Sequence, residues 1–268
     1  MPVNSHIQIP NAVLRNFRNP FTGKVFHLDL TLQRIRSCSS DILGTEYGYF
    51  SDEMEQYLSK KIEKPFSELV SSVRAFLNSD CPLLEMPIAF EDTCKRYISS
   101  AMYRSGLALK MLIQGSVTAP FVSAQENHDD LVRVGLQHNN GIFPQLADYE
   151  MIVLVNRTQV QFVVPRNCFF EVSSHSVKCL IAPISPDCAL CLAPKEFRRE
   201  IIEDAESRMG FLDNAEDVWV SNNHALQFEY VFNHGFVAAA NKTELQNLLK
   251  YLNSQKSELE KIRTEVMR

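Results

Sequence analysis

The sequence predicts an α+β fold, in which strands occupy two separate stretches of the chain and a helical block lies between them. Apolar and polar residues alternate over 25–38, apolar residues recur at helical spacing over 51–138, and β-branched residues dominate several segments of 151–192. This order differs from the strand–helix alternation of a parallel sheet. With 268 residues and a hydrophobic fraction of 45%, the chain is long enough to bury one substantial core.

The first strand group is a hairpin. A turn at 21–24 precedes a strand over 25–30, in which Phe26, Leu28 and Leu30 share one face and the opposite face is mostly polar. Residues 32–38 can pair back on this strand. The alternation is typical of a half-buried hairpin.

The helical block begins at Ser51, a good N-cap followed by two acidic residues. A second helix is expected to start at Pro65, because proline is favoured in the first turn of a helix. A longer helix is predicted over 90–114 and another over 128–138, with a loop over 78–87.

The second strand group starts with segments 151–155 and 160–164, which a turn at 156–159 would join as a hairpin. Two more strands are predicted over 177–184 and 188–192. Helices over 195–208 and 220–232 and an extended segment over 236–240 complete the domain, which we expect to span residues 1–240.

Residues 241–268 form a predicted C-terminal helix that begins at Asn241. Its apolar residues alternate at spacings of three and four, as in a coiled-coil seam, with one polar position at Gln255. Self-association or a protein partner would use this seam. A helix packed back on its own domain is the alternative. The seam consists of Leu245, Leu248, Leu252, Leu259, Ile262 and Val266.

Composition restricts the location and the class of ligand. The net charge is −5, and a negative net charge does not indicate nucleic acid as a partner. A small local basic site could still bind it. We expect neither a signal peptide nor a membrane span. Seven scattered cysteines suggest reduced thiols in a cytoplasmic protein. The lone Cys188-x-x-Cys191 pair lies in a predicted strand, so we expect no zinc and no cofactor.

The opening of the chain resembles a known family. His6, Pro10 and the run Leu14-Arg15-Asn16-Phe17 are similar to the signature of a bacterial domain-of-unknown-function family numbered four-two-three-eight. The spacing is one residue longer, and Ile7 replaces an aromatic residue. Weaker similarities cover roughly residues 5–240: Tyr49 to Glu53, Tyr103 to Gly106, Pro165 to Cys168, where Arg166 replaces the family's aspartate, Pro183 to Pro186, and Asn222.

This resemblance implies a candidate site at His6, Arg104, Asn167 and Asn222. An imidazole titrates near neutral pH and suits proton transfer, and a guanidinium can hold a phosphate or carboxylate with paired donors. Structural alternatives are an exposed or capping His6, and an Arg104 on a wet helix face or paired with Glu91 or Asp92.

Two functions follow from these observations. The first is a non-catalytic interaction or regulatory protein that assembles through its C-terminal helix. The alternative is a divergent hydrolase or nuclease-like module that acts on nucleic acid or nucleotide, with His6 as acid–base and Arg104 as anion clamp. The arginine at position 166 favours the first. We also expect residues 6–17 to pack against the core, and His6 to share a cleft with Arg104.

Overall fold

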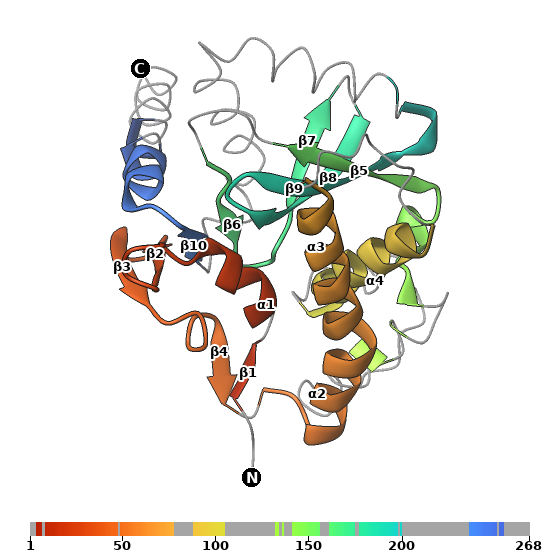
Figure 1. Cartoon of the computed structure of the whole chain (residues 1–268), viewed down its shortest axis with the longest axis horizontal. Coiled ribbons are helices and arrows are strands. Elements are labelled where there is room, and N and C mark those ends of the chain that lie inside the picture. The colour runs from red at the N-terminus through yellow and green to blue at the C-terminus, as the bar shows by residue number, and fades with distance from the viewer. Residues whose placement is uncertain are drawn as a thin grey trace, which may run out of the picture.

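The computed structural model describes residues 4–6, 9–47, 49–77, 88–104, 132–133, 136, 141–155, 161–174, 177–197, 199, 236–250 and 252–254. The α+β class is confirmed: helices pack beside antiparallel sheets, and every strand pairing in the described residues is antiparallel (Figure 1). The predicted helices over 128–138 and 195–208 lie largely outside these residues, and that over 220–232 lies wholly outside them. The expected loop over 78–87 does so too.

The larger sheet has the strand order β5-β9-β8-β7. Its strands are β5 (Tyr149–Val155), β7 (Phe170–Ser174), β8 (Val177–Ser185) and β9 (Cys188–Pro194). The two strands predicted over 177–184 and 188–192 are confirmed as β8 and β9, and they pair antiparallel. Cys188 and Cys191 contribute to different hydrophobic clusters, as strand alternation requires. Strand β7 was not predicted from the sequence, because the apolar run around Phe170 is short. Short 3₁₀ turns lie before β5 (Pro144–Leu146) and after β9 (Lys195–Phe197).

The expected hairpin between 151–155 and 160–164 is wrong. Strand β5 pairs with β9, whereas the second segment contributes only the short strand β6 (Val164–Pro165) to the other sheet. Adjacent segments with similar β propensity need not pair, because tertiary contacts choose the partner of a strand.

A second four-stranded sheet has the order β3-β2-β10-β6, and we call it the smaller sheet because its strands are on average shorter. It joins N-terminal and C-terminal segments of the chain. The predicted hairpin is present as β2 (Val25–Asp29) and β3 (Arg34–Cys38), and β10 (Phe236–Ala239) pairs antiparallel with β2. The turn between β2 and β3 places Gln33 at a positive φ of 52°. Strand β3 is one edge of this sheet.

The C-terminal helix, over 242–250 and 252–254, packs on the smaller sheet. Leu245, Leu248 and Leu252 are buried in one cluster with Leu28 of β2 and Val237 of β10. These leucines are therefore not available for a coiled-coil seam, and the expectation of self-association through them is corrected. This part of the helix packs back on its own domain, which was the alternative prediction. Leu259, Ile262 and Val266 lie outside the described residues.

One long helical element runs from Asp52 to Leu77. Ser51 caps α2 (Asp52–Leu58) by accepting a hydrogen bond from the Met54 N–H at 3.2 Å, as predicted. A π-helical turn (Ser59–Glu63) then connects α2 to α3 (Lys64–Leu77), so no new helix begins at Pro65. A proline lacks the N–H that a regular helix needs and crowds the preceding turn, and a widened π turn can accommodate it.

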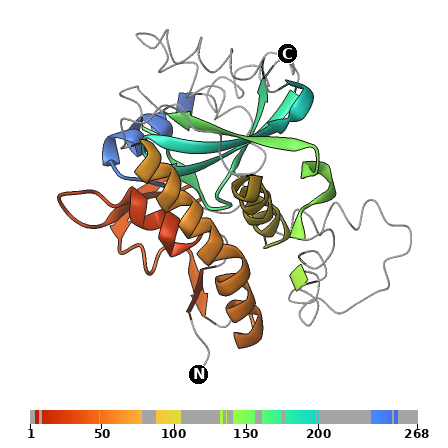
Figure 2. The same ribbon diagram turned by 45° about the vertical axis from the view of Figure 1, so that its right-hand side comes forward.

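Helix α4 (Ile88–Arg104) lies beside α3, and both face the larger sheet (Figure 2). The described part of the helix that was expected over 90–114 ends at Arg104. The main hydrophobic cluster is formed by these helices, the inner face of the larger sheet and the opening segment.

The opening segment packs into this cluster, which confirms the prediction for residues 9–17. It comprises β1 (Asn4–His6), which pairs with β4 (Thr45–Tyr47), then α1 (Asn11–Leu14) and a 3₁₀ turn (Arg15–Phe17). Four of its apolar side chains are at most 3% exposed: Ile9, Val13, Leu14 and Phe17. The signature run thus supplies core residues.

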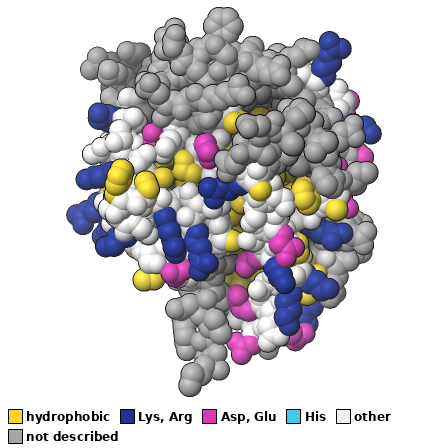
Figure 3. Space-filling model, viewed as in Figure 1, with side chains coloured by type: hydrophobic (Ala, Val, Ile, Leu, Met, Phe, Trp, Pro, Cys, Tyr) yellow, Lys and Arg dark blue, Asp and Glu magenta, His cyan; other side chains and the backbone are white. Residues whose placement is uncertain are grey.

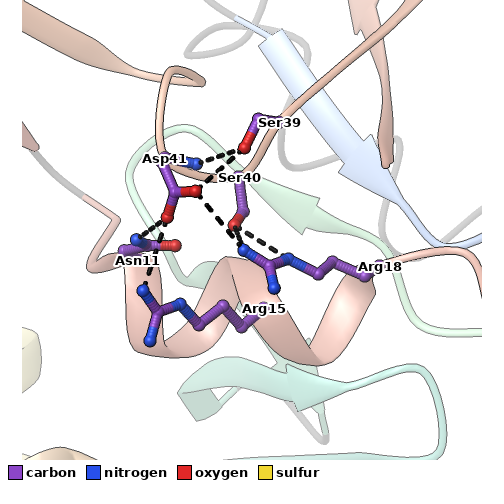
Figure 4. A network of polar contacts seen from close by, with 6 residues as sticks. All are labelled: Asn11, Arg15, Arg18, Ser39, Ser40 and Asp41. Carbon is purple, nitrogen blue, oxygen red and sulfur yellow. Dashed lines mark hydrogen bonds and ion pairs between the residues drawn. The ribbon is translucent and has the colours of Figure 1, made fainter. Parts of the chain in front are cut away.

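The polar residues of the signature fasten this segment to the rest of the fold. Asn16 donates to the Ile184 carbonyl at 2.9 Å and accepts a hydrogen bond from Arg74 at 2.7 Å, so it connects the segment with β8 and α3. Arg15 lies 3.4 Å from the Asp41 carboxylate, which also accepts hydrogen bonds from Asn11 and Ser39 (Figure 4). Every member of the run therefore has a structural role.

We predict that Asp41→Asn removes part of the acid sensitivity of folding. Hydrogen bonds from Asn11 and Ser39, and the nearby Arg15 and Arg18, lower the pKa of Asp41. A carboxylate with a lowered pKa stabilises the fold above its unfolded pKa of about 3.9, and this contribution is lost as the pH falls through the folded pKa. Urea unfolding at pH 7 and below pH 4 measures the difference. Asp41→Asn should lower the free energy of unfolding at pH 7 and lower it less below pH 4. Glu68→Gln, a control at an exposed position, should change the free energy of unfolding at neither pH.

Candidate functional site around Arg104

Arg104 is a charged residue that lies inside the protein. Its side chain is 0% exposed, and its Nη1 donates to Glu63 Oε1 at 3.2 Å. The partners that the sequence suggested are wrong: Glu91 instead pairs with Lys95 at 2.9 Å, one helical turn away on α4. A wet helix face is also excluded by the burial of Arg104.

The π turn brings Glu63 to this arginine. Glu63 is the last residue of the turn, which lies against α4. Its side chain keeps 26% of its surface exposed, so the ion pair connects the interior to the surface of the molecule. Single π turns occur often at functional sites.

One edge of the Arg104 guanidinium has no hydrogen-bond partner among the described residues. Its Nε and Nη2 are buried and unsatisfied. These two N–H groups point in the same direction, and together they form the side-on fork that binds a planar oxyanion with two parallel hydrogen bonds. Buried donors of this kind are rare in native proteins and require an explanation.

Two buried hydroxyls lie on the same helix. The hydroxyls belong to Tyr97 and Ser100. Ser100 Oγ has no hydrogen-bond partner within the described part of the chain, whereas the Tyr97 hydroxyl interacts with the Cys168 thiol. With Arg104, they follow the spacing of three and four residues that places side chains on one face of a helix. The Tyr97 ring is held by Phe66 of α3, with ring centroids 3.5 Å apart and planes 7° apart.

Cys168 faces this group of residues from the turn that follows β6. The backbone φ of Cys168 is 62°, a value that is unusual for residues other than glycine. The Cys168 N–H donates to the Pro165 carbonyl at 2.9 Å. The thiol lies beside Tyr97 and within electrostatic range of Arg104. Burial raises the pKa of Cys168 to about 12 and that of Tyr97 well above its usual value, so both stay neutral at neutral pH.

The arrangement suits recognition of an anion more than proton transfer. A guanidinium fork, a phenol and a serine hydroxyl are each hydrogen-bond donors that an oxyanion can accept from. The neutral Cys168 and Tyr97 add no competing negative charge. We define the Arg104 cluster as Arg104, Glu63, Tyr97, Ser100 and Cys168.

The other predicted site residues are only partly placed. Asn167 is half-buried and immediately precedes Cys168, so its turn reaches the Arg104 cluster. The backbone of His6 lies in β1, but its side chain is outside the described residues, as is the whole of Asn222. The expected convergence of His6 with Arg104 thus stays a prediction.

Sequence reasoning missed Glu63, Ser100 and Cys168 as members of this cluster. The spacing of 97, 100 and 104 along one helix was the available signal. The contributions of Glu63 and Cys168 come from segments about 40 and 60 residues away, which no local pattern brings together.

In the described part of the chain, no helix has the length and apolarity to cross a membrane, and no group of three or more histidine, cysteine or acidic side chains is arranged to hold a metal. No family model, no curated protein and no solved structure matches this chain, so the family resemblance stays an expectation.

Proposed function

We propose that the protein is a non-catalytic binding protein whose ligand presents a carboxylate to Arg104. The observation that carries this proposal is the buried, unsatisfied Nε/Nη2 edge of the guanidinium. A buried donor without a partner costs about 1–3 kcal/mol, and more when it is charged. A bound carboxylate would satisfy both donors at once.

Charge favours a carboxylate over a phosphate dianion. Arg104 is already paired with Glu63, so the two side chains together carry no net charge. A ligand with one negative charge adds less repulsion against Glu63 than a ligand with two. The hydroxyls of Tyr97 and Ser100 can support a carboxylate without adding charge.

The proposal also includes the location and the assembly of the protein. Six cysteines in the described residues are free thiols, and five of them are buried, which supports a reducing, cytoplasmic setting. A protein partner would meet the part of the predicted coiled-coil seam that consists of Leu259, Ile262 and Val266. The alternative hydrolase or nuclease-like function requires His6 as acid–base and keeps Arg104 in the same anion-binding role.

Thermal unfolding of the full chain in the presence of sodium acetate, sodium benzoate or inorganic phosphate tests the proposal. A ligand that binds only the folded state raises the midpoint in proportion to the logarithm of its concentration once the site is filled. The carboxylates should stabilise the wild-type protein more than phosphate at equal ionic strength.

Variants of the cluster sharpen the test. Arg104→Lys keeps the charge but loses the fork, and it should bind benzoate about 10- to 100-fold more weakly, since a hydrogen bond to a charged group contributes about 1.5–3 kcal/mol. Glu63→Gln should bind it more tightly because it removes a nearby negative charge. Arg74→Lys, at the exposed bond to Asn16, is the matched control and should match the wild type.

Two outcomes would contradict the proposed function. The first is a carboxylate effect of equal size in the wild type and Arg104→Lys, which would be a general salt effect. The second is no stabilisation at any concentration, which would assign the unsatisfied donors to buried water.

A further inference from the structure

A thiol and an imidazole face each other on the smaller sheet, away from the Arg104 cluster. Cys38 Sγ of β3 lies 3.8 Å from His27 Nδ1 of β2, at hydrogen-bond distance for sulfur. The two residues are diagonal neighbours across the β2–β3 ladder. The rings of His27 and Phe236 of β10 lie in an edge-to-face arrangement, with centroids 6.2 Å apart and planes at 76°.

Cys38 differs from the other described cysteines in its accessibility. It is half-buried, whereas Cys94, Cys168, Cys179, Cys188 and Cys191 are buried. Among the thiols that the structure describes, Cys38 is therefore the one that a reagent in solution can reach.

Burial and neighbouring charges shift the pKa values of both His27 and Cys38. Burial and the nearby Arg36 lower the pKa of His27, although Asp29 opposes them, so the imidazole is neutral at neutral pH and can accept a proton. Burial raises the pKa of Cys38 in spite of Lys24. The thiol is thus protonated at rest, and a proton acceptor beside it is needed to form the thiolate.

Positive side chains on the same hairpin lie near this pair, with Arg36 close to His27 and Lys24 close to Cys38. Lys24, Arg34 and Arg36 are exposed on the same hairpin, and the space-filling view shows Lys and Arg side chains along the left side of the molecule, over β2 and β3 (Figure 3). The chain as a whole carries a net charge of −5, so this local excess of positive charge is distinctive. It would attract a small molecule that carries carboxylates.

We propose that Cys38 is a site of reversible thiol–disulfide exchange with a low-molecular-weight disulfide that carries carboxylate groups, and that His27 accepts the thiol proton. In this step the Cys38 sulfur attacks one sulfur of the small disulfide. A new bond forms between Cys38 Sγ and that sulfur while the original sulfur–sulfur bond breaks. The proton passes to His27 and then to the departing thiolate, which leaves as a thiol. Cys38 is oxidised and half of the small disulfide is reduced.

The reaction of the full chain with oxidised glutathione, followed by peptide mapping with mass spectrometry, tests the position of the adduct. We expect one glutathionyl group on Cys38, reversed by dithiothreitol and missing in Cys38→Ser. An adduct at other cysteines with Cys38 unmodified would overturn the proposal.

Rates for two disulfides separate the roles of the neighbours. His27→Asn should react at least tenfold more slowly with both oxidised glutathione and the uncharged 2-hydroxyethyl disulfide, because less thiolate forms. Lys24→Ala should slow the reaction with oxidised glutathione more than the reaction with 2-hydroxyethyl disulfide, because Lys24 both favours the thiolate and attracts carboxylates. Lys61→Ala, at an exposed lysine on the π turn, should slow neither reaction. Circular dichroism confirms that each variant is folded. Equal rates for the wild type and His27→Asn would show that Cys38 reacts as an isolated thiol and would refute the assisted mechanism.

Discussion

A chain truncated after Ala240 is expected to unfold or aggregate. The deletion removes Leu245, Leu248 and Leu252, which are buried against β2 and β10. Burial of one such side chain is worth about 1.5–3 kcal/mol, so the loss of three is comparable to the total stability of about 5–15 kcal/mol of a typical domain. It also uncovers the apolar face of the smaller sheet. Light scattering and circular dichroism of the truncated chain measure both effects.

Single substitutions in the same helix provide the control for this truncation. Leu245→Ala, at a position that is 0% exposed, should lower the free energy of unfolding by about 2–5 kcal/mol. Gln246→Ala, at an exposed position of the same turn, should change it by less than about 0.5 kcal/mol. A truncated chain that remains folded with an unchanged unfolding midpoint would show that the packing of the helix contributes little.

Phe17→Ala is expected to destabilise the protein by about 3–5 kcal/mol, the usual cost of removing a buried aromatic ring. Phe17 is 0% exposed and lies in the main hydrophobic cluster. A chain of this length should lose about 2–4 °C in the unfolding midpoint for each kcal/mol. Calorimetry or denaturant unfolding would measure this loss.

Phe21→Ala makes the same chemical change four residues later, where the ring is 94% exposed. It should leave the unfolding midpoint nearly unchanged. If the two variants have equal stability, the opening segment is not anchored in the core, and the structural account of the signature run is wrong.

The signature run shows how a sequence feature can suggest a function and have a structural explanation. Leu14 and Phe17 fill the core, Arg15 lies against Asp41, and Asn16 connects β8 with α3. These contacts explain the residue type at each of the four positions of the run. The site proposed here depends instead on Arg104 and on the unsatisfied donors of its cluster.

Local physics explains why some elements could be predicted from the sequence. The hairpin β2–β3 follows from alternation, and β8 and β9 follow from two apolar runs separated by a short turn. Ser51 caps its helix through a contact three residues away. The inward stripe of α3 and α4 follows from helical periodicity. In each case, the interacting residues are close in sequence.

Contacts between distant segments could not be predicted in this way. The pairing of β2 with β10 joins residues about 200 positions apart in the sequence. Strand β6 pairs with β10 and not with β5, the strand that precedes it in the sequence. The seam of Leu245, Leu248 and Leu252 indicated an amphipathic helix but not what it would contact, because a coiled coil and a docked helix use the same spacing.

The sequence by itself determined the α+β class, the local hairpins, the helix start at Ser51, and the presence of an arginine in an apolar helix. Only the tertiary structure decided that this arginine is buried, that Glu63 pairs with one of its nitrogens, and that Tyr97, Ser100 and Cys168 surround it. The reason is that the burial and partners of a charged side chain depend on segments that come together only on folding, whereas strand and helix patterns depend on neighbours along the chain.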